Sequence, residues 1–112
     1  MTSQQLALHI ADMLEDKKAL EVTVLDIGHL TVIADCFVIA SGRSALQVKA
    51  LYEDLDEKLS AEGVDILRHD GTHEARWIVV DLGHVIVHLF HQEEREFYNI
   101  ERLWMDGSNR LR

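Results

Sequence analysis

Three groups of residues in this chain have types and spacings that could support chemistry or binding, and the first is a turn of small residues. The run SGRS, from Ser41 to Ser44, follows an apolar stretch and precedes a helix-like one. Backbone N–H groups at such a helix N-terminus can hold a phosphate, and nucleotidyltransferases combine this turn with carboxylates that hold two metal ions. The next strand-like run, VDIL, carries Asp65 alone, and Asp81 lies two strands later beside a turn. A turn that caps a helix is therefore the favoured interpretation, and a small nucleotidyltransferase acting through Ser44 and Asp65 is the alternative.

Histidines form the second group, because histidine is the commonest zinc ligand. His84 and His88 lie on one strand-like run, where a rise of about 3.3 Å per residue puts them about 13 Å apart, too far to share an ion. His69 and His73 have the i, i+4 spacing of helical ligands, but Gly71 and the turn-like sequence HDGTH argue against a helix there. No metal site is expected, although a metal-dependent regulator using His69 and His73 is an alternative. We expect His88 to be a hydrogen-bonded core histidine.

The third group is the C-terminal segment REFYNIERLW, which is rich in aromatic and charged residues. Projected onto a helix at about 100° per residue, Phe97, Ile100 and Trp104 share one face, which predicts a core stripe. Arg95, Tyr98 and Arg102 gather within about 60° on another face. Tyrosine and arginine are enriched at protein interface hot spots, so this second face indicates a partner surface. The alternative is a solvated flank whose charges pair with Glu94 or Glu101.

The elements that must position these groups follow from apolar spacing and from cap and turn residues. Ser44 stands three residues before Gln47 as a capping box, and Gly63 offers a helix stop. The expected order is helix, two strands, helix, three strands, helix. The expected ranges are a helix from about 3 to 17, strands 21–27 and 35–40, a helix 45–61, strands 64–67, 77–81 and 84–90, and a short helix from about 92.

This order predicts one α/β domain with a mixed sheet of five strands flanked by helices. A long helix between two strands predicts a crossover between parallel neighbours, whereas short turns predict antiparallel ones. Val85, Val87 and Leu89 are expected in the core, and the helix from Ala45 to about Ala61 should cover one face. The domain is expected to span 1–105, with a loose C-terminal tail over 106–112.

Composition narrows the class of partner. The 112 residues carry 20 acidic and 11 basic side chains, a net charge of -9. Such a chain is poorly suited to grip nucleic acid directly, and a basic protein surface is the more plausible target. Cys36 is the only cysteine, and neither an export signal nor a membrane-length apolar run is evident, so a cytoplasmic protein is expected.

Several motifs taken together closely resemble the Iojap-like ribosomal silencing factors, small proteins of bacteria and organelles. The match covers nearly the whole chain, from the first helix to Trp104. It departs from the family at Cys36, where an aromatic residue is usual, and at Asp70, where glutamate is usual. The matching motifs are ADCFVIASGRS from Ala34, QVKA from Gln47, Gly71, WIVVD from Trp77, VHLF from Val87 and REFYNIERLW from Arg95.

The resemblance implies a nucleotidyltransferase-like fold without catalytic carboxylates, and a translational repressor rather than an enzyme. Members of the family bind ribosomal protein L14 of the large ribosomal subunit and stop the small subunit from joining when nutrients are scarce. No cofactor is implied, and either a monomer or a homodimer fits. We expect the partner surface on the last two strands and the C-terminal helix. Its residues are expected to be Trp77, Asp81, Arg95, Tyr98 and Glu101.

Overall fold

A computed structural model describes all 112 residues of the chain, which form one α/β domain. The N-terminal and middle helices match the expected ranges closely, and the C-terminal helix is split in two. The helices are α1 (Ser3–Asp16), α2 (Ala45–Ala61), α3 (Gln92–Tyr98) and α4 (Ile100–Trp104). The strands are β1 (Leu20–Asp26), β2 (Cys36–Gly42), β3 (Arg68–Asp70), β4 (Trp77–Asp81) and β5 (Val85–His91).

The five strands form one mixed sheet in the order β1-β2-β5-β4-β3, which confirms the predicted sheet. Only β2 and β5 run parallel, and every other neighbouring pair is antiparallel. The expected crossover between parallel neighbours is wrong in one respect. Helix α2 leads from β2 to β3 at the far edge of the sheet, and β4 and β5 then fill the gap through short turns.

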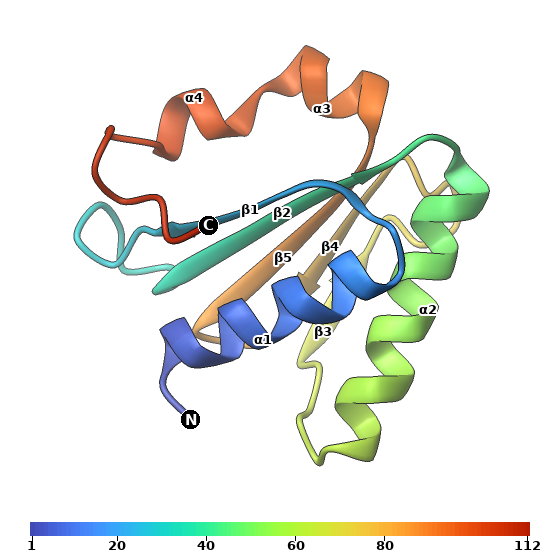
Figure 1. Cartoon of the computed structure of the whole chain (residues 1–112), viewed down its shortest axis with the longest axis horizontal. Helices are drawn as coiled ribbons and strands as arrows, with labels where there is room; N and C mark the ends of the chain where they lie inside the picture. The colour runs from blue at the N-terminus through green and yellow to red at the C-terminus, as the bar shows by residue number, and fades with distance from the viewer.

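Helices α1 and α2 cover the first face of the sheet (Figure 1). Both begin at hydroxyl caps. Thr2 accepts a hydrogen bond from the Gln5 backbone N–H, and the Gln5 side chain accepts one from Thr2 in return. Ser44 accepts from the Gln47 backbone N–H, but the Gln47 amide oxygen accepts from Arg43, so the predicted capping box is only half formed. The apolar stripes of the two helices then pack on the strands.

The main core lies between this face and the two helices. Val85, Val87 and Leu89 are fully buried in it, as predicted, together with Leu55 and Leu59 from α2. Burial of that many aliphatic side chains is the main stabilising contribution of the fold. No helix of the chain combines the length and apolar composition needed to cross a bilayer.

The second face of the sheet is only partly covered. Helices α3 and α4 lie over β5, β2 and β1 on this side, and Ile100 packs with Phe37 and Phe90 in a smaller apolar cluster. On the β4 and β3 part of this face the helices reach only Trp77, which Tyr98 of α3 contacts, and Val79 is half-buried. We call this part the open half-face; it comprises the same-side residues Arg68, Asp70, Trp77, Val79 and Asp81.

Strand β3 differs from its prediction. The apolar run Val64 to Leu67 was expected to be the strand, but the structure places it in the loop before Arg68–Asp70. Val64 and Ile66 pack against the main core, and Leu67 is exposed. The alternating burial of residues 64–67 therefore comes from a loop that packs against the main core. The residues that pair with β4 are polar because they form the edge of the sheet.

The C-terminal tail is ordered, which contradicts the predicted loose segment. Its backbone pairs with β1: the Asp26 N–H donates to the Asn109 carbonyl at 2.9 Å, and the Leu111 N–H donates to the Val24 carbonyl at 2.8 Å. The Arg112 guanidinium then contacts Asp12 and Glu15 of α1. The tail thus covers the free edge of β1.

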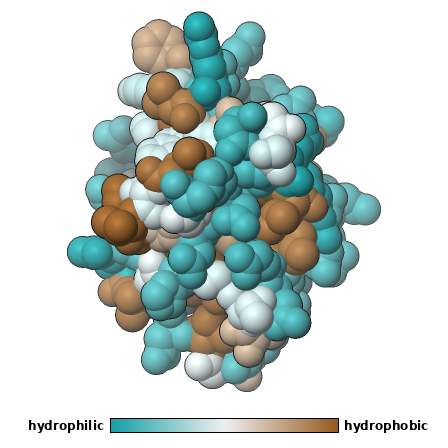
Figure 2. Space-filling model, turned by 90° about the vertical axis from the view of Figure 1, so that its left-hand side faces the viewer, coloured by the Kyte–Doolittle hydropathy of each residue, from teal (hydrophilic) through white to brown (hydrophobic).

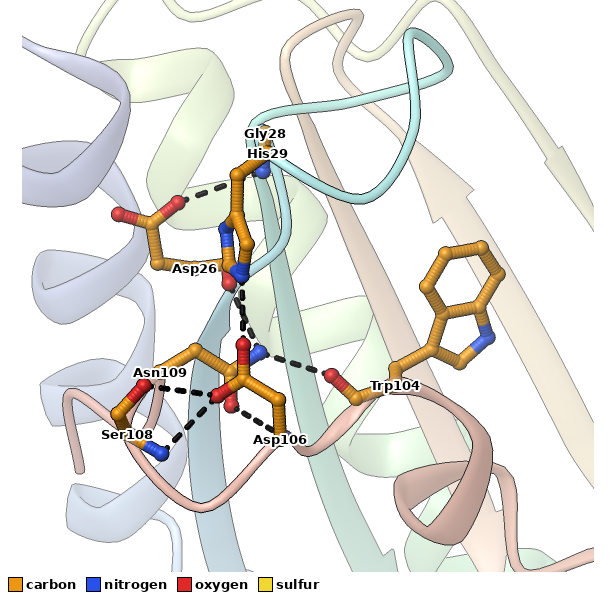
Figure 3. Close-up of polar contacts among 7 residues, drawn as sticks. All are labelled: Asp26, Gly28, His29, Trp104, Asp106, Ser108 and Asn109. Atoms are coloured by element: carbon orange, nitrogen blue, oxygen red, sulfur yellow. Dashed lines mark hydrogen bonds and ion pairs between the residues drawn. The ribbon is translucent and has the colours of Figure 1, made fainter.

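Side chains lock the tail in place (Figure 3). The buried Asn109 amide donates to the Asp26 carbonyl at 2.9 Å and to the Trp104 carbonyl at 2.8 Å. His29, in the loop between β1 and β2, lies 2.6 Å from the Asp106 carboxylate. Hydrogen bonds from His29 and from Ser108 lower the pKa of Asp106 to about 2. These contacts join the loop, β1, α4 and the tail.

Candidate functional site

An aromatic cluster stands at the border between the open half-face and α3. The Trp77 ring, on β4, stacks on Phe90 of β5 with ring centroids 4.7 Å apart. Tyr98, the last residue of α3, also packs against Trp77, with ring centroids 5.0 Å apart. Tyr98 is 48% exposed and its neighbour Phe97 is 80% exposed. This cluster presents rigid aromatic surface to solvent, the type of residue that anchors protein interfaces.

His88 lies beneath this cluster, as the expected core histidine. Trp77 Nε1 donates a hydrogen bond to His88 Nδ1 at 3.2 Å, and Phe37 packs edge-on against the imidazole. Burial lowers the pKa of His88 from its usual 6.5 to about 4. The prediction of a hydrogen-bonded core residue is confirmed for Nδ1, but Nε2 is buried without a partner.

Asp81 lies on the open half-face, at the end of β4. It receives hydrogen bonds from Arg68 Nε at 2.8 Å and from the Gly83 N–H at 2.8 Å, and these contacts lower its pKa although burial opposes them. Arg68, Asp70, Val79, Asp81 and Ile86, with His69, line a shallow cavity of about 130 Å³. The half-face therefore combines a small apolar floor with charged walls.

A larger groove of about 510 Å³ lies beside the aromatic cluster. The loop from Asp70 to Arg76 forms one wall, and Trp77 and Tyr98 form the other. Gly71 has φ +84°, and a Cβ there would lie 2.0 Å from the Trp77 carbonyl oxygen. Only glycine allows the loop to approach β4 this closely, so Gly71 sets the width of the groove.

Arg95 occupies a different place from the one predicted. It is 6% exposed, beneath α3 and α4, and not on a surface with Tyr98 and Arg102. Its guanidinium donates to Glu101 Oε1 at 3.0 Å, to Ser41 Oγ at 2.8 Å and to Thr23 Oγ1 at 3.2 Å. Arg95 and Glu101 therefore form an internal ion pair that joins α3 to α4.

The helical projection of the segment is wrong because the helix breaks at Asn99. Asn99 has φ +45° and ψ +55°, a left-handed conformation that ends α3 and starts α4. The break turns Phe97 out to solvent, whereas Ile100 is buried and Trp104 half-buried as expected. Asparagine is one of the few residues other than glycine that adopt this conformation readily. Asn99 is therefore the residue in the sequence that could have indicated the helix break.

The SGRS turn caps α2, as the favoured interpretation predicted. Ser44 Oγ is occupied by the Gln47 N–H, and Gly42 packs against Val48. Asp65 is exposed in the loop before β3 and not on a strand, so it is not placed as the carboxylate of a nucleotidyltransferase site. A third cavity, of about 530 Å³, is lined by Glu21, Glu96 and Glu101 among others.

The histidines do not converge. His69 packs on Tyr52 at 5.3 Å between ring centroids, His84 lies 3.6 Å from Asp35, and His91 caps α3 through the Glu93 N–H. No three His, Cys, Asp or Glu side chains come together in an arrangement suited to a metal ion.

Exposed aliphatic side chains also occur away from the aromatic cluster, in the loop between β1 and β2. Leu30, Val32 and Ile33 are exposed there. Figure 2 faces this end of the molecule and shows separate apolar patches interrupted by hydrophilic side chains. The aromatic cluster with the open half-face is therefore the stronger candidate for a site.

Comparisons with known proteins identify the family to which the chain belongs. Residues 1–111 match the family model described as ribosomal silencing factor during starvation. The chain is 41% identical over 107 residues to the ribosomal silencing factor of Halalkalibacterium halodurans, covering 96% of this chain and 92% of that one. The corresponding factor of Bacillus subtilis is 40% identical over 93 residues, covering 83% and 79%.

A solved structure supports the same assignment. A crystal structure of a Chromobacterium violaceum protein superposes with a TM-score of 0.89 at 36% identity, covering 93% of this chain and 87% of that one. The matching family is regulatory and not enzymatic. The chain belongs to the ribosomal silencing factor family.

Proposed function

We propose that this protein silences translation by binding the large ribosomal subunit, through ribosomal protein L14, and blocking the joining of the small subunit. The repression would act when nutrients are limiting. The mechanism is steric and requires no bond to be made or broken. Its support is family membership together with the geometry of the aromatic cluster and the open half-face.

The observation that carries the proposal is the exposed contact between Trp77 and Tyr98. Two aromatic rings 5.0 Å apart, backed by Phe90, form a rigid surface that loses little conformational entropy on binding. They border an open sheet face whose other side chains are Val79 and a mixture of charges. Interface hot spots have this composition, with an aromatic centre and a polar rim.

Charge and size fit the same partner. The net charge of -9 favours encounter with a basic ribosomal protein and disfavours contact with the surrounding RNA. The molecule measures 34 × 34 × 23 Å along its principal axes. A body of that thickness keeps apart two surfaces that must touch, so binding alone would prevent subunit joining.

The five residues expected in the partner surface divide into two groups. We propose that Trp77, Tyr98 and Asp81 contact the ribosomal protein directly, because their side chains lie at the aromatic cluster or the open half-face. Arg95 and Glu101 act from behind this surface. Their ion pair holds α3 against α4, and so fixes where Tyr98 stands.

The test measures both binding and subunit joining with separated ribosomal subunits. Wild-type protein should co-sediment with large subunits and not with small ones, and at saturation it should deplete joined ribosomes on a gradient. Tyr98→Ala should weaken binding by about 2 kcal/mol, roughly thirtyfold, while the domain stays folded. Unimpaired joining at saturating wild-type protein would refute the proposal.

Leu46→Ala supplies the matched control. Leu46 is 80% exposed on α2, which covers the opposite face of the sheet. It removes an exposed apolar side chain without touching the proposed surface, and it should bind like wild type. If Leu46→Ala lost as much affinity as Tyr98→Ala, the surface would be misplaced even though the ribosomal function stood.

A further inference from the structure

His88 is buried in a way that the stability of the fold does not explain. It is 8% exposed, on a strand whose neighbours are apolar on both faces. Of all the buried side-chain nitrogen and oxygen atoms in the chain, only His88 Nε2 has no hydrogen-bond partner. An unpaired buried donor is destabilising, and an aliphatic residue of similar volume would avoid that penalty.

The tautomer of His88 follows from its one hydrogen bond. An indole N–H can only donate, so Nδ1, which lies 3.2 Å from Trp77 Nε1, must be the unprotonated acceptor. In the neutral ring the proton is then on Nε2, enclosed by aromatic neighbours such as Phe37. The unpaired donor is thus a consequence of using Nδ1 to hold Trp77.

The bond determines how Trp77 lies on the sheet. Trp77 is half-buried, stacked on Phe90 and in contact with Tyr98. Stacking on Phe90 alone does not determine which edge of the indole faces the sheet, because a stacked ring can rotate in its own plane or flip over. An acceptor buried under the indole N–H selects one orientation and directs the remaining ring edge and face outward.

We propose that His88 is a positioning residue for docking: its Nδ1 fixes the indole of Trp77 in the orientation that the partner recognises. The inference rests on the proposed function, because it takes Trp77 to be part of the docking surface. His88 itself would not touch the partner, because it is buried. Its unpaired Nε2 lowers the stability of the fold relative to an apolar side chain at this position. Binding and stability should therefore respond in opposite directions when His88 is replaced.

Two substitutions separate the acceptor from the rest of the side chain. His88→Leu fills the site with apolar volume, removes the unpaired donor and deletes the acceptor for Trp77. His88→Asn retains an oxygen near the position of Nδ1 but leaves unfilled volume in the core. We expect His88→Leu to unfold at the same temperature as wild type or a higher one, and to bind large subunits about tenfold more weakly. His88→Asn should unfold at a lower temperature and bind close to the wild-type level.

The indole N–H signal of Trp77 in an NMR spectrum reports the positioning directly. The chain has two tryptophans, and Trp77→Phe identifies which signal belongs to Trp77. In His88→Leu this signal should shift and exchange faster with solvent, whereas in His88→Asn it should stay near its wild-type position. The signal of Trp104, which is linked to His88 only through Phe37, should change less than that of Trp77 in both variants. This readout does not depend on ribosome binding, so it tests the positioning even if the proposed function fails.

A double-mutant cycle completes the test. If His88 acts through Trp77, His88→Leu should add no further loss of affinity in a Trp77→Phe background. A His88→Leu variant that binds like wild type with a displaced Trp77 signal would overturn the inference. So would parallel losses of stability and affinity in His88→Leu, which indicate a purely structural role. Binding by His88→Asn no better than by His88→Leu would also overturn it, since that result assigns the function to Nε2.

Discussion

Arg95 and Glu101 form a charge pair in which the Arg95 guanidinium is buried and the Glu101 carboxylate is partly buried. Arg95 makes hydrogen bonds to Glu101, to two hydroxyl groups and to the Leu20 carbonyl, so its donors are occupied. A pair of this kind is weak evidence for net stabilisation, because desolvation of the two charges offsets their attraction. Removal of Arg95, however, leaves the partly buried Glu101 carboxylate without its counter-charge.

Arg95→Met is therefore expected to lower the free energy of unfolding by about 3 kcal/mol, measured by denaturant titration. The double variant Arg95→Met, Glu101→Leu should recover most of that loss, because no isolated charge remains. Binding to large subunits should stay impaired in the double variant, since Tyr98 would no longer be held in place. If Arg95→Met alone were as stable as wild type, the ion pair would not be buried as described.

Burial of His88 makes the stability of the protein depend on pH. Its pKa falls from 6.5 to about 4 in the folded state, so the unfolded chain binds a proton that the folded chain resists. Stability should be unaffected by this group above pH 6.5 and should decrease as the pH falls from 6.5 towards 4, by about 3 kcal/mol in total. His88→Leu should remove this part of the pH dependence. Equal pH profiles for the two proteins would contradict the burial of a neutral imidazole.

At the scale of elements, the second face is organised by segments with little helical or strand character of their own. The break at Asn99 turns α4 back over β1 and β2, and the tail then returns along the edge of β1. Asn109 lies where these parts meet, and it bonds to both Asp26 and Trp104. One side chain thus joins α4, β1 and the tail.

Asn109→Ala should reduce the free energy of unfolding by about 2 kcal/mol, because two partly buried backbone carbonyls lose the donor that the buried Asn109 amide supplies. Amide hydrogen exchange should accelerate in the tail and in α4 while the α2 amides stay protected. Ser108→Ala is the matched control: it keeps the backbone N–H bond to Asp106 and loses only an exposed hydroxyl bond, so it should cost less stability than Asn109→Ala. Unchanged exchange throughout Asn109→Ala would mean that the tail is held by its backbone pairing alone.

At the scale of the whole molecule, charge governs how fast a partner is met. The domain carries a net charge of -9, and one of its carboxylates, that of Asp70, lies directly on the open half-face. Opposite charges across an interface mainly raise the association rate, and salt screens that effect.

Association with large subunits should therefore slow as salt is added, with a smaller change in the dissociation rate. Asp70→Asn should lower the association rate and weaken its salt dependence. Glu53→Gln, which removes the same charge from the exposed side of α2, should do so less. Equal effects of the two variants in a binding-kinetics measurement would show that net charge matters and that the half-face does not.

The central strands and the two long helices were predictable from sequence because each depends on local spacing. Runs of Val, Ile and Leu at 36–42 and 85–91 form central strands that are buried on both faces, and the stripe of Leu51, Leu55 and Leu59 forms α2. The aromatic residues Trp77 and Tyr98 were identified as surface candidates because packing alone does not account for them. The family resemblance rested on the same residues.

Tertiary structure decided the features that depend on partners distant in sequence. Val64 and Ile66 are apolar because they pack against the main core, so their spacing resembles that of a strand. The true edge strand is polar because its residues are exposed to water. Arg95 is buried because Ser41, Thr23 and Glu101 satisfy its charge, and no helical projection contains those partners. The tail has no apolar pattern and is ordered through hydrogen bonds to β1, more than 80 residues earlier. The sequence by itself determined the local periodicity of the chain, and the fold determined which polar groups found partners, since those contacts exist only after the chain has closed.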